Sequence, residues 1–132
     1  MIYLDTSVLL AQILAEDRKP PAAFWEDVGD GALIASRLLV YECWVRIQAR
    51  GLAGTHGDAV RAWLSRVTLV ELVPPVLARA TEPFPHPVRT LDALHLASMV
   101  FLRARGVPVR LATYDQRQGD VARAMGFEVL GL

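Results

Sequence analysis

The sequence predicts an α/β domain, a three-layer α/β/α sandwich with helices on both faces of a central parallel sheet. Short apolar runs alternate with segments whose apolar residues recur at helical spacing along the whole chain. Alternation of this kind is typical of right-handed crossovers between parallel strands. The 132 residues, 53% of them hydrophobic, suffice for one buried core, so we expect a single domain over residues 1–132.

Five short runs rich in apolar or β-branched residues are predicted to be strands. The first run ends directly in Asp5, and Pro74-Pro75 stops the third, because proline cannot donate to a sheet ladder. The predicted strands cover residues 1–4, 32–35, 68–73, 109–113 and 127–130. The three prolines within 82–87 allow neither a helix nor a central strand, so this segment is predicted to be a loop.

Helices are predicted between these strands from apolar spacing and from capping residues. Thr6 or Ser7 is available as the N-cap of the first helix. Ser36, Thr90 and Asp115 are N-cap candidates for later ones. The predicted helices cover residues 8–14, a short turn around 24–25, and then 36–50, 56–67, 76–80, 90–105 and 115–125.

The formal net charge is zero, which argues against a protein that binds nucleic acid through a large positive net charge alone. The basic residues are Lys19 and thirteen arginines. Arginine suits bidentate contacts with phosphate, although a bias toward arginine can also reflect genome base composition. The lone Cys43 excludes an internal disulfide, which fits a reducing cytoplasm.

No segment of the sequence predicts export or a membrane span. The first residues lack a basic stretch before their apolar run, unlike a secretory signal. The longest apolar stretch, 93–102, is too short for a bilayer, which needs about 20 residues. We therefore expect a soluble, cytoplasmic protein.

Four acidic residues are candidates for a functional site, and each has a structural alternative. Asp5 and Asp115 follow predicted strands, where either could simply cap the next helix. Asp92 lies in the first turn of a predicted helix, a position that favours a negative charge in any case. Glu42 lies on a mostly apolar helix face, where it could pair with Arg46.

Taken together, the four acids predict a metal site. If the first and fourth strands are neighbours, Asp5 and Asp115 meet at the topological switch point of the sheet. Helix connectivity returns Asp92 and Glu42 to the same edge. Converging carboxylates repel one another, and a divalent cation with oxygen ligands, Mg²⁺ or Mn²⁺, removes the repulsion. Three scattered histidines and one cysteine do not form a zinc site, and His95 is read as a core residue.

At this point the sequence resembles a known family. The resemblance rests on four segments in order, and it extends over nearly the whole chain: Leu4-Asp5-Thr6-Ser7, Tyr41-Glu42, Arg89 to Ala97 and Thr113-Tyr114-Asp115. In this combination they look like a PIN domain, and more narrowly a VapC-type toxin nuclease of a bacterial toxin–antitoxin pair. Residues 51–87 carry no family signature, and we expect substrate choice to be set there.

The resemblance implies roles for individual residues. It makes Asp5, Glu42, Asp92 and Asp115 an acidic quartet that binds Mg²⁺, with Thr6 and Thr113 as supporting hydroxyls. It implies metal-dependent hydrolysis of RNA to a 5′-phosphate and a 3′-hydroxyl, a cognate antitoxin as partner, and a homodimer. Arg89 and Arg117, close in sequence to the acids, are candidates for phosphate contacts.

Two other classes of function remain open from the residues alone. The same fold could be a non-catalytic module that binds RNA or protein, with its carboxylates acting only as helix caps. A phosphatase or phosphoacceptor domain also places an aspartate after its first strand. Those domains use a second acid two residues later or a lysine after a late strand, whereas this chain has Ser7 and a loop residue, Lys19.

Three large apolar residues could belong to an interface or to the ordinary core. These are Leu38, Trp44 and Trp63. We expect them to be core residues, because apolar residues at helical spacing usually face the domain interior.

Overall fold

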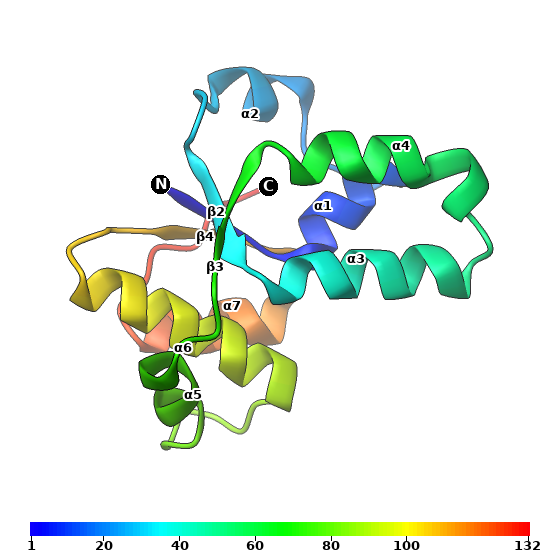
Figure 1. Ribbon diagram of the computed structural model, residues 1–132. Helices are drawn as coiled ribbons and strands as arrows, with labels where there is room; N and C mark the ends of the chain where they lie inside the picture. Colours follow the sequence, from blue (N-terminus) through cyan, green and yellow to red (C-terminus); the bar gives the residue numbers. More distant parts are fainter.

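A computed structural model describes residues 1–132, and it confirms the predicted α/β architecture (Figure 1). A parallel sheet of four strands has the order β3-β2-β1-β4. The strands are β1 (Ile2–Leu4), β2 (Leu33–Ser36), β3 (Val67–Val70) and β4 (Arg110–Ala112). The first and fourth strands are neighbours, as the convergence of Asp5 and Asp115 requires.

Helices cover both faces of the sheet and form the two outer layers. In Figure 1, α1, α3 and α4 lie together on one side, while α6 lies on the other with α5 against it. The helices are α1 (Thr6–Ile13), α2 (Ala22–Asp27), α3 (Leu38–Ala49), α4 (Ala53–Leu64), α5 (Pro74–Ala80), α6 (Thr90–Ala104) and α7 (Gln116–Ala124). None of them is long and apolar enough to cross a membrane.

The strands divide their side chains between two hydrophobic cores, because successive residues of a strand point to opposite faces. Ile2 and Leu4 join the core beneath α1 to α4, whereas Tyr3 joins the core beneath α6 and α7. On β2, Leu33 and Ile34 divide in the same way. The apolar runs that predicted the strands are thus buried on both faces.

The predicted fifth strand, 127–130, is wrong. The segment forms only an isolated parallel bridge between Leu111 and Val129. Two backbone hydrogen bonds hold it beside β4, from Leu111 to Glu128 and from Leu130 back to Leu111. Its apolar residues are explained by packing rather than by strand pairing, since Phe127 is buried in the core beneath α6 and α7.

The predicted helix caps need three corrections. Asp5, not Thr6 or Ser7, is the N-cap of α1, and its side chain accepts the backbone N–H of Ser7 at 3.2 Å. Thr90 is the first residue of α6 rather than its cap. Ser36 lies one residue before the N-cap of α3, although its hydroxyl accepts the backbone N–H of Leu38.

Helices α4 and α5 differ most from the prediction. Helix α4 covers Ala53–Leu64 instead of 56–67, and Val67 already belongs to β3. The third strand ends at Val70 instead of residue 73, so Pro74 and Pro75 do not stop it directly. They begin α5 instead, because the first turn of a helix leaves its N–H groups unpaired and tolerates proline. The predicted stops at Gly51 and Gly106 are confirmed, with φ angles of 66° and 79° just after α3 and α6.

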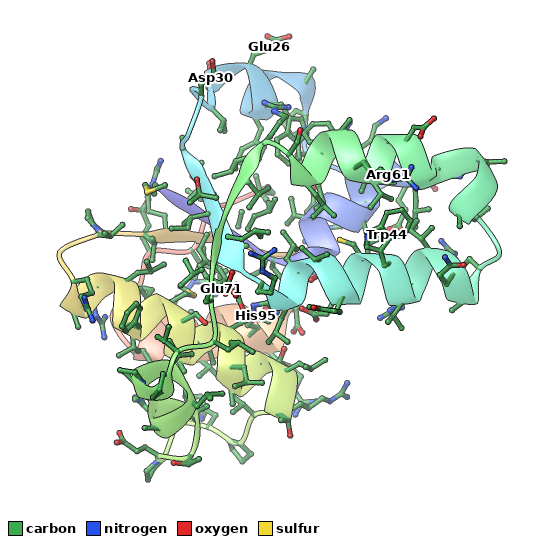
Figure 2. All side chains as sticks on the ribbon, viewed as in Figure 1. Glu26, Asp30, Trp44, Arg61, Glu71 and His95 are labelled. Atoms are coloured by element: carbon green, nitrogen blue, oxygen red, sulfur yellow. The ribbon has the colours of Figure 1, made fainter.

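Two of the three large apolar residues pack against the core as predicted, and arginine side chains stack on their rings. Trp44 and Trp63 are partly buried and pack against the core beneath α1 to α4, whereas Leu38 is not part of either core and lines a surface pocket. Arg61 of α4 lies over the Trp44 ring of α3 at 5.2 Å from its centroid (Figure 2). Arg66 lies over Trp63 at 4.7 Å. Stacked guanidinium groups cover apolar rings while keeping their charge at the surface.

We predict that Leu39→Ala lowers the free energy of unfolding by about 2–5 kcal/mol, because it leaves a cavity at a fully buried position of α3. Urea unfolding followed by circular dichroism measures the change. Val45→Ala on the same helix is the control, since Val45 is 66% exposed and its truncation should change stability by less than about 0.5 kcal/mol. Equal losses in the two variants would contradict the assigned core.

Candidate active site

One pocket gathers all four acidic residues that the sequence singled out. It has a volume of about 550 Å³ and lies beyond the C-terminal end of β1. Its lining includes Asp5, Glu42, Asp92 and Asp115. A larger pocket of about 710 Å³, beneath the proline loop, contains no carboxylate. The acid-lined pocket is therefore the one equipped for metal or phosphate chemistry.

Asp5 is fixed in place through a single oxygen. The residue is buried at the end of β1, where its backbone N–H donates to Ala112 of β4 at 3.0 Å. Its Oδ2 accepts hydrogen bonds from the Ser7 hydroxyl at 2.5 Å and the Thr113 hydroxyl at 2.9 Å, besides the Ser7 N–H. Oδ1 accepts no hydrogen bond from the protein, and it is the oxygen left for a ligand.

The hydroxyls of Thr113 and Ser7 also connect β1 to the segment after β4. Thr113 Oγ1 accepts the backbone N–H of Asp115 at 2.9 Å while donating to Asp5. Ser7 Oγ accepts the backbone N–H of Tyr114 at 3.0 Å while donating to Asp5. Each hydroxyl therefore ties the position of Asp5 to the start of α7. Thr6 lines the pocket, but its hydroxyl is buried without a partner.

Asp115 repeats the arrangement of Asp5. It is the N-cap of α7, and its Oδ1 accepts the backbone N–H groups of Arg117 at 3.0 Å and Gln118 at 3.2 Å. Its Oδ2 accepts no hydrogen bond from the protein. Both aspartates therefore cap a helix with one oxygen and keep the other for the pocket, so capping and ligand binding do not compete.

Glu42 is held by a buried chain of hydrogen bonds and not by Arg46. The backbone N–H of Ser36 donates to the Tyr3 hydroxyl at 3.1 Å, and this hydroxyl contacts His95 Nδ1 at 2.8 Å. His95 Nε2 in turn contacts Glu42 Oε1. Since the Tyr3 hydroxyl has one proton to donate, the network assigns it to Nδ1 and leaves the N–H on Nε2 to donate to Glu42.

His95 contributes to the site from inside the core. Its side chain is 1% exposed, and Figure 2 shows it near the centre of the molecule, where α6 lies close to the sheet. Burial works to lower the pKa of His95, but the hydrogen bond and negative charge of Glu42 outweigh it, so the pKa is raised overall. Burial also raises the pKa of the nearby Cys43 thiol to about 12.

Asp92 shows that the carboxylates affect one another electrostatically. It lies half-buried in the first turn of α6. Burial raises its pKa, and the negative charges of Asp115, Asp5 and Glu42 raise it further, against a smaller opposing effect of His95. Carboxylates that shift one another's pKa are typical of functional sites, and a bound cation would relieve their repulsion.

Comparison with known proteins places the chain in a family. A family model described as PIN domain matches residues 2–124. Ribonuclease VapC35 of Mycobacterium tuberculosis is 32% identical over 132 residues, which cover 98% of this chain and 96% of that protein. The chain belongs to the PIN-domain family of VapC ribonucleases.

Two further relatives agree with this assignment. Ribonuclease VapC47 of Mycobacterium tuberculosis is 29% identical over 129 residues, which cover 96% of this PIN domain and 93% of that protein. The crystal structure of Mycobacterium tuberculosis VapC20, a toxin that cleaves the sarcin–ricin loop, aligns over 100% of both chains with a TM-score of 0.65. At 18% identity this second likeness supports the fold.

The arginines predicted to contact phosphate lie at the border of the acid pocket. Arg89 lines it directly. Arg117 lines a smaller adjoining pocket of about 80 Å³, to which Arg89, Asp92 and Asp115 also contribute. Arg46, which the sequence suggested as a partner of Glu42, instead lines the acid pocket. None of these three guanidinium groups forms a salt bridge, so each is free to meet an anionic ligand.

The donor set of the PIN domain fits a hard divalent cation. All candidate ligands are carboxylate oxygens, and Asp5 and Asp115 each present an oxygen without a hydrogen bond. No group of three or more His, Cys, Asp or Glu side chains is already gathered at ligand distances. The carboxylates surround the pocket, and a cation would draw them inward against their mutual repulsion.

His95 is the site residue that the sequence alone does not assign to the site. The sequence places Ser7 two residues after Asp5, and its hydroxyl makes the shortest contact with that residue. His95 is a core residue as predicted, but it also donates to Glu42. The spacing of His95 three residues after Asp92, on one helix face, was the available signal.

We predict that Asp92→Asn raises the melting temperature of the metal-free protein at pH 7. A carboxyl with a raised pKa binds its proton more tightly in the folded than in the unfolded protein. Stability therefore falls as pH rises through the interval between the two pKa values, and a neutral amide removes this loss. The difference should shrink as the pH falls below the ordinary aspartate pKa, where the carboxyl is protonated in both the folded and the unfolded protein. Thermal unfolding in EDTA measures the effect.

The same pair of proteins tests for the cation. Mg²⁺ should raise the melting temperature of the wild type more than that of Asp92→Asn, because the variant has lost a ligand. Asp30→Asn, at an exposed turn far from the pocket, is the control and should respond to Mg²⁺ as the wild type does. An equal Mg²⁺ response in all three proteins would count against Asp92 as a ligand.

Proposed function

We propose that this protein is a Mg²⁺-dependent endoribonuclease, formed by a single PIN-like domain over residues 1–132, and the toxin of a toxin–antitoxin pair. The observation that carries the proposal is the pocket where four carboxylates meet at the end of β1. Membership of the VapC ribonuclease family over nearly the whole chain supports RNA as the substrate.

Asp5, Asp92, Asp115 and Glu42 would hold the cation, for which Mn²⁺ is an alternative. When bound, the metal supplies an activated water and neutralises charge on the phosphate. Asp5 and Asp115 offer ligand oxygens in positions fixed by helix capping and by Thr113. Glu42 offers Oε2, since Oε1 accepts the N–H of His95. No histidine is needed as a general base.

Arginine side chains would orient the substrate. Arg89 and Arg117 stand beside Asp92 and Asp115, and a guanidinium group pairs with phosphate through two parallel hydrogen bonds. Both are exposed, so an RNA backbone can reach them. Their proximity to the acids would place a phosphodiester next to the metal ligands despite the zero net charge of the chain.

The family assignment supports proposals for partners and location. We expect an RNA substrate, a cognate antitoxin that covers the acid pocket, a homodimer, and a cytoplasmic protein. Leu38, Tyr41 and Val45 of α3 form an apolar border on the acid pocket, with Tyr41 62% exposed. This border is the surface on which a protein partner would meet the site.

A non-catalytic binding module is the second candidate, and one observation favours it: Asp5 and Asp115 do cap helices. Capping alone predicts no cation site. Calorimetric titration with Mn²⁺ separates the candidates, because a module whose acids serve only as caps should release no heat of specific binding.

We predict that the purified protein hydrolyses structured RNA in Mg²⁺ or Mn²⁺ and that EDTA abolishes the reaction. Asp5→Asn and Asp92→Asn should each lower the rate by about 100-fold or more, since each removes a charge from the metal site. Denaturing gels of labelled RNA measure the products. Asp58→Asn, fully exposed on α4, is the matched control and should leave the rate unchanged. Hydrolysis that survives both site variants, or that ignores EDTA, would sink the proposal.

We predict that His95→Asn lowers the rate about 10- to 100-fold, the range typical of groups that orient a metal ligand. Asparagine can reach the position of Nδ1 but not that of Nε2, so it loses the donor to Glu42. His95→Gln can reach the position of Nε2 and should restore most of the activity and of the Mn²⁺ affinity measured by calorimetry. If the two variants lose activity equally at equal melting temperature, His95 does not position Glu42.

A further inference from the structure

Gln118 is a buried polar residue for which the fold supplies no partner. Its side chain is 2% exposed in the first turn of α7, and both amide atoms, Oε1 and Nε2, lack any hydrogen bond. The residue lines the small pocket of about 80 Å³ that adjoins the acid pocket. Its backbone N–H is satisfied by Asp115, so only the side chain is unpaired.

An unpaired amide in this position does not stabilise the fold. A buried donor or acceptor without a partner destabilises a protein relative to an apolar residue of the same shape. Gln116, two residues earlier on the same helix, is exposed to solvent. Burial of a glutamine side chain is therefore not a general feature of this part of α7. Gln118 is therefore best explained by a ligand group that pairs with its amide.

The amide restricts the chemistry of that ligand group. Oε1 needs a donor and Nε2 needs an acceptor. A phosphate oxygen accepts only, and a metal ion would satisfy Oε1 alone, so each would leave one atom unpaired. A hydroxyl group both donates and accepts, and it can pair with both atoms of one amide.

The surroundings restrict the ligand further. Arg89 and Arg117 line the same pocket, which fits a phosphate attached to the group that carries the hydroxyl. Asp92 and Asp115 line both pockets, so the small pocket adjoins the proposed metal site. Its volume of about 80 Å³ suits a few atoms of a sugar, not a nucleobase, given about 30 Å³ for one water.

We propose that Gln118 recognises the ribose 2′-hydroxyl of a nucleotide next to the scissile phosphate, with Arg89 and Arg117 on the adjoining phosphate. The inference rests on the proposed ribonuclease function and adds the group by which the protein distinguishes RNA from DNA, which lacks this hydroxyl. Arg89 and Arg117 are exposed side chains that line the same pocket as Gln118, so one nucleotide can contact all three residues.

The test compares binding of a short single-stranded RNA, the DNA of the same sequence, and its 2′-O-methyl form, which cannot donate. Each carries a 5′ fluorescein, and anisotropy is measured in Ca²⁺ with a gel check that the RNA stays intact. The wild type should bind RNA about tenfold more tightly than the other two, as expected for two buried hydrogen bonds. Gln118→Leu should bind all three with the weaker affinity, while Gln116→Leu should keep the preference.

Thermal unfolding separates this role from a structural one. Gln118→Leu should melt at or above the wild-type temperature, because it removes two unpaired polar atoms from a buried position. Gln118→Met, which keeps the length of the side chain, is the second variant if leucine disturbs the fold. Loss of RNA preference together with a lower melting temperature in both variants would overturn the proposal.

RNA hydrolysis in Mg²⁺, assayed in parallel, distinguishes the two hypotheses. If the wild type hydrolyses RNA but prefers RNA equally with and without Gln118, or shows no preference, the hydroxyl subsite is wrong and the nuclease stands. If RNA is not hydrolysed but the binding preference depends on Gln118, the nuclease is wrong and the subsite stands.

Discussion

The parallel pairing of β1 with β4 decides the layout of the whole site. Ile2, Tyr3 and Leu4 pair in register with β4, and the Asp5 N–H extends the ladder to Ala112. This register brings Asp5 beside Thr113, whose hydroxyl then joins Asp5 to the start of α7. A shift by one residue would turn Tyr3 away from His95 and Asp5 away from the pocket, because strand side chains alternate between faces.

Asp5 and Asp115 each use one carboxylate oxygen to stabilise the fold and leave the other available for a ligand. One oxygen of Asp5 and one of Asp115 satisfy the N–H groups at the start of a helix, and the other faces the pocket. Glu42 follows the same rule with a histidine N–H in place of a helix end. Asp92 accepts no such bond, and burial and the negative charges of the other three acids raise its pKa. The four acids thus differ in whether hydrogen bonds from the protein hold their side chains in position for a cation.

Local signals in the sequence predicted most of the fold and the acids of the site. Apolar runs that alternate with helical segments predict the parallel sheet. Acids that follow predicted strands identify Asp5 and Asp115 as candidates for the site. Segment 127–130 was mistaken for a strand because a short apolar run looks alike whether it pairs or only packs. The link from Glu42 to His95 joins α3 to α6 across 53 residues, and only tertiary packing reveals it. The unpaired Gln118 amide is likewise invisible until its surroundings are known.

The single cysteine gives the protein a chemical property that follows from its place in the core. Cys43 is fully buried on α3, immediately after Glu42, and its pKa is raised to about 12. A thiol that stays protonated and enclosed is a poor nucleophile, so oxidants and alkylating reagents have no route to it in the folded protein. The rate at which a thiol reagent labels Cys43 therefore measures how often the helices around α3 open. No engineered cysteine is needed to follow this motion beside the acid pocket.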